Sequence, residues 1–252
     1  MRTILFLLPV YNEGARLDAL LNRIKATMEA EHLPYRVVAV DDGSADDSAD
    51  ILARRGSDMP IQVLTHRFNR GLGETCRDGL EWVADHAAPD DVVITMDADD
   101  THDPAYVPGM LKRIDLGADV VIGSRFQPGA EVKGVPSHRQ AFSVGANLLL
   151  RTFLRIPGVR DYACGFRAVR ASLIRRAVLA LGNRLLELRE WGFICTAELL
   201  WKLSLFGARC EEVPFVLRYD LKAGASKMRA GQTIFGYLLL IWKRIAGAPA
   251  VA

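Results

Sequence analysis

The sequence predicts an α/β fold in which a mostly parallel sheet is flanked by helices. Three observations predict it. Short apolar runs alternate with segments of helical spacing, the apolar runs are continuous, and a polar or charged cluster follows most of them. Continuous apolar strands are typical of parallel sheets, because helices bury both faces of such a sheet. The chain of 252 residues, 50% hydrophobic and 25% charged, suits one large domain or one domain with an appendage.

The expected elements follow one another in a regular order through the first half of the chain. Strands are expected over residues 3–8, 36–40, 61–64, 92–96 and 120–122. Helices are expected between them, over residues 15–30, 47–55, 73–86 and 104–116. Local signals support the helices, since Ser44 can cap the second and Pro104 suits the first turn of the fourth.

The second half departs from this alternation. A loop with glycine and proline is expected over residues 126–136, and a strand over 210–217. Helices are expected over 137–156, within 185–206 and over 232–245. The first of them carries polar residues at steps of four, three of them arginines, so we expect an amphipathic helix with a basic polar face.

We divide the chain into two parts. Residues 1–228 are expected to form one domain with two halves, 1–125 and 126–228. Residues 229–252 form a C-terminal apolar helix and tail. The longest uncharged stretch near the C-terminus, 230–242, is shorter than the roughly 20 apolar residues that span a bilayer, so we expect no transmembrane helix. The apolar N-terminus is expected to be a strand, because its apolar core is short for a signal peptide.

Composition argues against several kinds of site. The formal net charge of +2 gives no indication of a nucleic-acid partner. The four cysteines and five histidines are scattered, with no C-x-x-C and no H-x-x-x-H spacing. This scatter argues against a zinc site or a disulfide framework and suits a reducing compartment.

Carboxylates close the expected fourth strand. Asp97 and Asp99 stand two residues apart, so on extended chain their side chains point the same way. Two hard oxygen ligands on one side suit a Mg²⁺ or Mn²⁺ ion that also holds a diphosphate. The alternative interpretation is a solvated acidic turn that also includes Asp100.

Polar residues also follow the second and third strands, where ligands of parallel sheets bind. Asp41 can accept a hydrogen bond from a ribose or base, or can belong to an Asp-Gly turn that caps the next helix. Arg70 and Gly71 precede a helix whose start can cradle a phosphate. The same segment nearly matches a dinucleotide-binding fingerprint, with Cys76 at its last glycine position. An NAD(P)-dependent oxidoreductase is therefore an alternative function.

Further charged residues are candidates in the second half. Arg125 at the fifth strand end, with Arg139 soon after, suits contact with phosphate groups, or else a solvated basic loop. Glu198 stands among apolar neighbours of an expected helix, where a carboxylate is costly unless it is paired or used. Asp161 and Glu198 are the candidates for a general base, should the reaction need one.

Taken in order, these motifs resemble those of family 2 glycosyltransferases, and within them the polyprenyl- or dolichol-phosphate sugar synthases (mannosyl or glucosyl). The resemblance covers about residues 3–228. The matching segments are residues 9–13, 41–44, 70–73, 96–104, 123–125, 161–167 and 224–227. In this family an Arg usually stands shortly before the last of these segments, whereas here Lys222 stands nearest and Arg218 lies further back.

The resemblance implies a GT-A fold, a Rossmann-like sheet with C-terminal amphipathic helices, a nucleotide-diphosphate sugar donor and a Mg²⁺ or Mn²⁺ ion. GDP-mannose or a UDP-sugar would be the donor and a polyprenyl phosphate the acceptor. Residues 1–228 would form the catalytic domain, in which 1–125 bind the nucleotide sugar and metal and 126–228 the acceptor. The resemblance also implies roles for single residues. Pro9, Tyr11, Glu13 and Asp41 would hold the nucleoside, Asp97 and Asp99 the metal and diphosphate, Arg125 and Arg139 the acceptor phosphate, and Lys227 the donor phosphates.

Single displacement at the anomeric carbon predicts an inverting transferase. The helices over 137–156 and 232–245 are expected to lie on a membrane surface, or else to pack against the core or a second subunit. We therefore expect a cytoplasmic protein, peripheral at the inner face of the membrane, and a possible homo-oligomer. A non-catalytic nucleotide-binding or membrane-scaffold protein is the remaining alternative.

Overall fold

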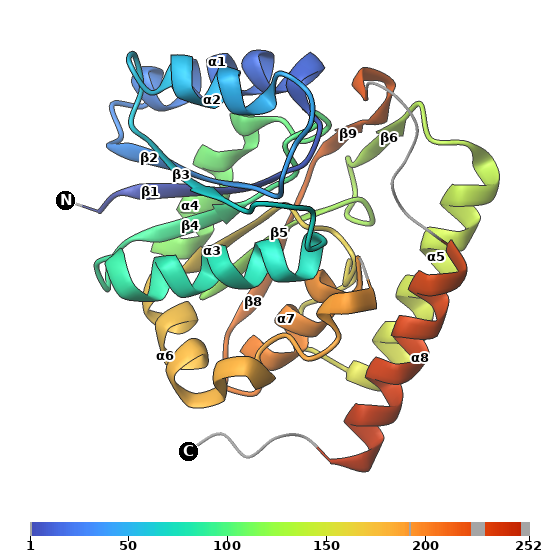
Figure 1. Cartoon of the computed structure of the whole chain (residues 1–252). Coiled ribbons are helices and arrows are strands. Elements are labelled where there is room, and N and C mark those ends of the chain that lie inside the picture. Colours follow the sequence, from blue (N-terminus) through green and yellow to red (C-terminus); the bar gives the residue numbers. More distant parts are fainter. Residues whose placement is uncertain (1, 192, 223–229, 248–252) are drawn as a thin grey trace.

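The computed structural model in Figure 1 describes residues 2–191, 193–222 and 230–247. Its main sheet has the strand order β3-β2-β1-β4-β7-β5-β8. All neighbouring strands are parallel except that β7 runs antiparallel to both β4 and β5. The predicted mostly parallel α/β sheet is confirmed. The strands are β1 (Ile4–Val10), β2 (Tyr35–Asp41), β3 (Ile61–Thr65), β4 (Val92–Thr95), β5 (Val120–Ser124), β7 (Arg167–Arg170) and β8 (Cys210–Pro214).

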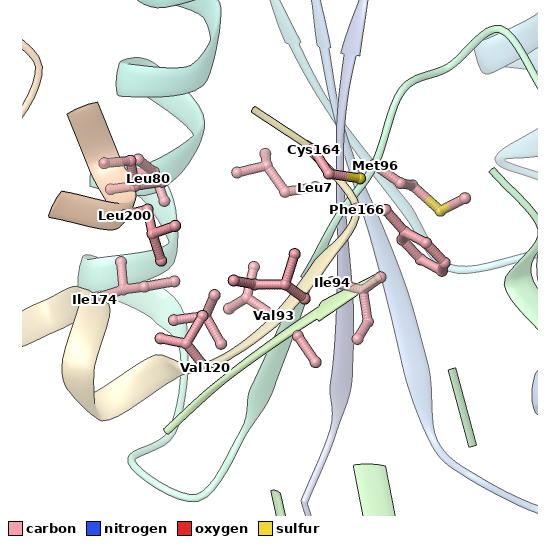
Figure 2. Close-up of a cluster of buried hydrophobic side chains, with 14 of the residues drawn as sticks. Leu7, Leu80, Val93, Ile94, Met96, Val120, Cys164, Phe166, Ile174 and Leu200 are labelled. Atoms are coloured by element: carbon pink, nitrogen blue, oxygen red, sulfur yellow. The ribbon is translucent and has the colours of Figure 1, made fainter. Parts of the chain in front are cut away.

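Helices cover both faces of this sheet. In Figure 1, α1 and α2 lie above it, and α3, α6 and α7 lie below. Figure 2 shows Leu80, Ile174 and Leu200, one from each of the lower helices, gathered beside Val93 and Val120 of the sheet. The strands are apolar throughout because both faces are buried in this way. The helices are α1 (Gly14–Ala30), α2 (Ser48–Arg55), α3 (Leu72–His86), α4 (Val107–Asp115), α6 (Ala171–Leu181) and α7 (Ile194–Ser204).

Two strands, β6 (Glu131–Lys133) and β7, and one helix, α6, have no counterpart among the expected elements. Strand β7 has only four residues and carries Arg167 and Arg170 at its two ends, so it forms no apolar run. Only its middle residues, Ala168 and Val169, are apolar and buried. It separates β4 from β5, and α6 follows it directly. Strands from both expected halves of the chain therefore belong to one sheet.

The strand expected over residues 210–217 is divided in the structure. Its first part is β8, which pairs with β5, and its second part is β9 (Val216–Arg218), which pairs with β6 (Glu131–Lys133) in a separate two-stranded sheet. The division falls at Phe215, which is buried against the rings of His102, Tyr106 and Phe166. Pro214 just before it has no backbone N–H with which to continue the ladder.

Two helices lie together at one side of the molecule, α5 (Ser137–Leu154) and α8 (Ala230–Ala246) (Figure 1). The expected basic polar face of α5 is wrong in one respect. Asn147, counted among its polar residues, is buried and accepts a hydrogen bond from the backbone N–H of Tyr162 at 2.7 Å. Val144 and Leu148 are instead exposed, so the outward face of α5 mixes apolar and basic side chains. No helix within the described ranges is long and apolar enough to cross a bilayer.

Candidate active site

A cavity of about 670 Å³ opens at the carboxyl ends of β1, β2 and β4. Strand ends form one wall of it, and segments from the second half of the chain form the other. This is the edge where parallel α/β sheets bind ligands. The lining residues are Pro9, Val10, Tyr11, Glu13, Asp42, Asn69, Arg70, Gly71, Leu72, Thr75, Asp97, Ala98, Asp99, Arg189, Glu190, Trp191, Phe193, Lys222, Gln232 and Thr233.

The structure brings most of the predicted donor residues together here. The predicted residues that line the cavity are Pro9, Tyr11, Glu13, Arg70, Gly71, Asp97 and Asp99. Those that do not line it are Asp41, Arg125, Arg139, Asp161 and Glu198. Lys227 lies outside the described residues. The first group comes from three separate strand ends, those of β1, β3 and β4, as the parallel sheet predicts.

Asp97 and Asp99 both face the cavity, but their surroundings differ. Asp99 Oδ1 accepts hydrogen bonds from the Thr101 backbone N–H at 3.2 Å and hydroxyl at 2.7 Å, and its Oδ2 accepts one from Lys222 Nζ. Burial opposes the charged form of Asp99, but Lys222 and Thr101 outweigh it and hold the pKa of this carboxyl below its usual value. Burial raises the pKa of Asp97, against the attraction of His102 and with the added repulsion of Asp99.

The donor set of this pair fits a divalent cation. Two carboxylates supply hard oxygen atoms on one side, which Mg²⁺ and Mn²⁺ prefer, and Mg²⁺ is commonly held by one or two carboxylates together with phosphate oxygens of a ligand. Within the ranges that the structure describes, no group of three or more His, Cys, Asp or Glu side chains is arranged as a metal site. A cation at Asp97 and Asp99 would therefore need ligand oxygens to complete its coordination.

Asp100 takes no part in the carboxylate pair. Its backbone has a φ of 64°, in the left-handed region. Its side chain forms an ion pair with Arg23 at 2.7 Å and does not line the cavity. The acidic turn therefore separates into two carboxylates that face the cavity and one that ties the turn to α1.

At the end of β2 it is Asp42, not the predicted Asp41, that lines the cavity. Asp42 Oδ1 accepts the backbone N–H of Arg70 and Oδ2 that of Gly71, both at 2.8 Å, and His66 Nδ1 lies 2.6 Å from Oδ1. Asp41 instead accepts the backbone N–H of Ser44 at 3.0 Å. Neighbouring residues of a strand point to opposite sides, and the sequence contains no signal that says which side the next loop covers.

The Arg70 side chain does not point to the carboxylate pair. Its guanidinium donates to Asp78 at 2.6 Å and to Glu74 at 3.3 Å, both on α3.

The fingerprint geometry of a dinucleotide site is not found in the described part of the chain. In that fold the acidic residue ends the neighbouring strand, whereas β1 and β2 lie between β3 and β4 here. The oxidoreductase alternative therefore has no support from the arrangement of the strands.

Arg125 and Asp161 form a bidentate ion pair away from the cavity, with N–O distances of 2.7 Å for both Nε and Nη2. Asp161 has no exposed surface and also accepts the backbone N–H of Cys164 at 3.1 Å. Burial opposes its charge, but Arg125 outweighs burial and keeps the pKa of Asp161 below its usual value. In this geometry Arg125 occupies both carboxylate oxygens of Asp161, and Asp161 does not line the cavity.

Glu198 likewise lies outside the cavity. It is fully buried and accepts the backbone N–H groups of Glu187 at 3.0 Å and Leu188 at 2.9 Å. Burial raises its pKa to about 7, against the two N–H donors. Glu198 thus holds the turn that leads to Arg189 and Trp191 of the cavity wall, and does not contact the cavity itself.

One residue of the cavity wall, Trp191, contacts a helix at the edge of the molecule. The Trp191 ring packs on Phe235 of α8, with ring centroids 4.7 Å apart. Arg139 of α5 donates from Nη1 to the Tyr219 hydroxyl at 3.0 Å. The predicted acceptor residue Arg139 therefore lies on the same side as α8 but outside the cavity.

Comparison with known proteins identifies the family. Residues 6–180 match the family described as glycosyl transferase family 2. The chain is 32% identical over 239 residues to a dolichol-phosphate mannosyltransferase of Pyrococcus furiosus, covering 94% of this chain and 62% of that protein. It is 31% identical over 230 residues to an undecaprenyl-phosphate mannosyltransferase of Micrococcus luteus, covering 90% of this chain and 88% of that protein. The chain thus spans less than two thirds of the length of the first relative.

Solved structures show the same fold. Glucosyl-3-phosphoglycerate synthase of Mycobacterium tuberculosis, crystallised with Mn²⁺ and UDP-glucose, superposes with a TM-score of 0.65 at 18% identity, covering 99% of this chain and 81% of that one. Its complex with phosphoglyceric acid gives a TM-score of 0.64 at 19% identity, covering 96% and 80%. The predicted GT-A fold is confirmed. The chain belongs to glycosyl transferase family 2, and its fold and family are those of a glycosyltransferase.

Proposed function

We propose that this protein transfers a sugar, with inversion, from GDP-mannose or a UDP-sugar to a polyprenyl phosphate, with Mg²⁺ or Mn²⁺ at Asp97 and Asp99. The observation that carries the proposal is the cavity itself. Its lining includes the carboxylate pair, Tyr11, Glu13 and Asp42, and two residues near the start of α8, Gln232 and Thr233. The names of the mannosyltransferase relatives support a lipid-phosphate acceptor.

The chemistry asks for positioning and charge balance more than for proton transfer. A bound divalent cation would act as a Lewis acid that stabilises the departing nucleoside diphosphate. Asp97 and Asp99 would hold that cation, while Tyr11, Glu13 and Asp42 would hold the nucleoside. A phosphate monoester acceptor is largely ionised near neutral pH, since its second pKa is about 6, so it needs no general base. The engagement of Asp161 and Glu198 elsewhere agrees with such an acceptor.

The protein has a surface that suits a membrane lipid acceptor, formed by α5 and α8. The outward faces of α5 and α8 expose large apolar side chains, and Trp191 joins this surface to the cavity. Arg151, Arg155 and Arg244 add positive charge, whereas Lys243 is paired with Glu187 at 3.3 Å. Amphipathic helices of this kind bind at the surface of membranes with anionic lipids. The exposed apolar residues are Val144, Leu148, Phe153, Ile234, Phe235, Leu238, Trp242 and Ile245.

We infer a peripheral location at the inner face of the membrane, with α5 and α8 in the interface. Replacing both Leu238 and Trp242 by Glu is expected to reduce binding to anionic phospholipid vesicles at least about tenfold, because charged side chains would enter the apolar layer. Vesicle flotation measures this. Leu179→Glu is the matched control, since Leu179 is 75% exposed on α6, at a distance from both helices in the fold. If wild-type protein remains with the bulk solution, or forms dimers through this face, the membrane assignment is wrong.

The donor assignment predicts which nucleotides stabilise the protein. With Mn²⁺ present, GDP or UDP is expected to raise the melting temperature and NAD is not, because only a ligand that binds the folded state stabilises it. Turnover of radiolabelled GDP-mannose and UDP-glucose with polyprenyl phosphate, and with the corresponding polyprenol, then separates a phosphate from a hydroxyl acceptor. Stabilisation by NAD alone, or folded protein without transfer from any donor of a wider panel, would contradict the proposal.

A further inference from the structure

Lys222 provides a positive charge inside the proposed metal site. It follows the short helical turn Tyr219–Leu221, and its Nζ donates to Asp99 Oδ2. The two side chains are nearly enclosed, 13% exposed for Lys222 and 6% for Asp99. Within the described ranges, no other Lys or Arg forms an ion pair with either carboxylate of the cavity. The ammonium group therefore neutralises the pair in part.

Both oxygens of Asp99 are engaged in this arrangement. Thr101 donates to Oδ1 through its backbone and its hydroxyl, and Lys222 donates to Oδ2. A divalent cation that takes Oδ2 as a ligand would lie against the ammonium group, and two like charges at such a distance repel strongly in a nearly enclosed site. The lysine and the cation would therefore compete for this side of Asp99.

The ammonium group of Lys222 can pair with groups other than Asp99. Lys222 lines the cavity, so it can pair with the oxygens of a bound diphosphate. Its Nζ also lies 5.8 Å from the centre of the Tyr219 ring, within range of a cation–π contact. The hydroxyl of that Tyr accepts a hydrogen bond from Arg139, which helps to keep the ring in place.

We propose that Lys222 is a resident counter-cation that competes with the metal for Asp99. When a diphosphate enters the cavity, Lys222 pairs with it and leaves Asp99 free to bind the metal. Metal alone would then bind weakly, and metal with a nucleoside diphosphate would bind cooperatively, since the nucleotide takes over the ammonium group. The inference rests on the proposed metal role of Asp97 and Asp99 and adds that Lys222 makes metal binding depend on the donor.

Manganese titration of the full chain tests this, with free Mn²⁺ followed by electron paramagnetic resonance. Without nucleotide, Lys222→Met is expected to bind Mn²⁺ at least about tenfold more tightly than wild type. With saturating GDP or UDP the difference should shrink, so the factor by which nucleotide enhances metal binding should fall in the variant. Lys222→Gln keeps a hydrogen-bond donor beside Asp99 but removes the charge, and it should show the same tighter binding. It replaces Lys222→Met in the test if that variant folds poorly.

Two control variants accompany this titration, and two outcomes would contradict the proposed role of Lys222. Lys222→Arg keeps the charge and Lys112→Met removes an exposed charge on α4, so both should bind Mn²⁺ like wild type. If wild type binds Mn²⁺ and the uncharged variants bind it no more tightly, the role of Lys222 is overturned and the metal site stands. If no form of the protein binds Mn²⁺, with or without nucleotide, the proposed metal site is wrong and the inference falls with it.

Discussion

Replacing Asp99 by Asn is expected to lower the rate of sugar transfer by at least about a hundredfold while the protein remains folded. Asn keeps the size of the side chain and an oxygen that can accept from Thr101. It removes the charge that would hold a divalent cation against the leaving diphosphate. A Lewis-acid contribution of several kcal/mol is at stake, and each 1.4 kcal/mol corresponds to about tenfold in rate. Transfer of labelled sugar at saturating donor measures the loss.

Asp85→Asn is a suitable control for this experiment. Asp85 is an exposed carboxylate near the end of α3 and does not line the cavity, so its neutralisation should leave transfer unchanged. Circular dichroism should confirm that both variants are folded. Transfer by the Asp99 variant at the wild-type rate, or by wild type in excess EDTA, would show that the carboxylate pair does not hold a catalytic metal.

The largest loss of stability is expected from Asp161→Asn. This change leaves the Arg125 guanidinium without its carboxylate partner at a site where Asp161 is fully buried. Breaking a buried ion pair from one side typically costs about 3–5 kcal/mol. For a domain of this size that corresponds to a fall in melting temperature of about 10 °C. Differential scanning calorimetry at neutral pH measures it.

The pH dependence of this effect has a definite sign. Arg125 holds the pKa of Asp161 below its usual value, so the stability that the carboxylate provides is present above about pH 4 and is lost as the pH falls through its lowered pKa. The gap between wild type and Asp161→Asn should therefore narrow in strong acid.

Two further variants distinguish the ion pair from other causes. Arg125→Met with Asp161→Asn should lose less stability than Asp161→Asn alone, because no unpaired charge remains. Asp220→Asn removes the partner of Arg218 in an exposed pair and should leave the melting temperature nearly unchanged, because solvent screens exposed ion pairs. Equal melting temperatures for wild type and Asp161→Asn would show that the pair does not stabilise the fold.

The sequence predicted those parts of the fold that have a strong local pattern. The first five expected strands and the helices between them are present, because long apolar runs and helical spacing reflect burial directly. Strand β7 was missed because four residues with an arginine at each end carry no such pattern. Its antiparallel insertion between β4 and β5 depends on the return path of the chain, which no local spacing records.

The candidate site divides in the same way. A period of two, expected for extended chain, put Asp97 and Asp99 on one side, and both line the cavity. In the structure β4 ends at Thr95 and residues 98–100 form a turn, so the turn and not strand alternation sets the direction of Asp99. The same alternation could not decide between Asp41 and Asp42. It puts their side chains on opposite sides of the strand but does not say which side the loop at Arg70 will cover.

The sequence by itself determined the class of the fold, the edge of the sheet where a ligand would bind, and the carboxylate pair at that edge. Only the tertiary structure decided which polar and charged groups pair with one another. Lys222 pairs with Asp99 across 123 positions of the chain, Arg125 with Asp161 across 36, and Glu198 accepts from a turn that precedes its own helix. The physical reason is that the spacing of residues determines the direction of a side chain within its own element, whereas its partner depends on how distant elements pack.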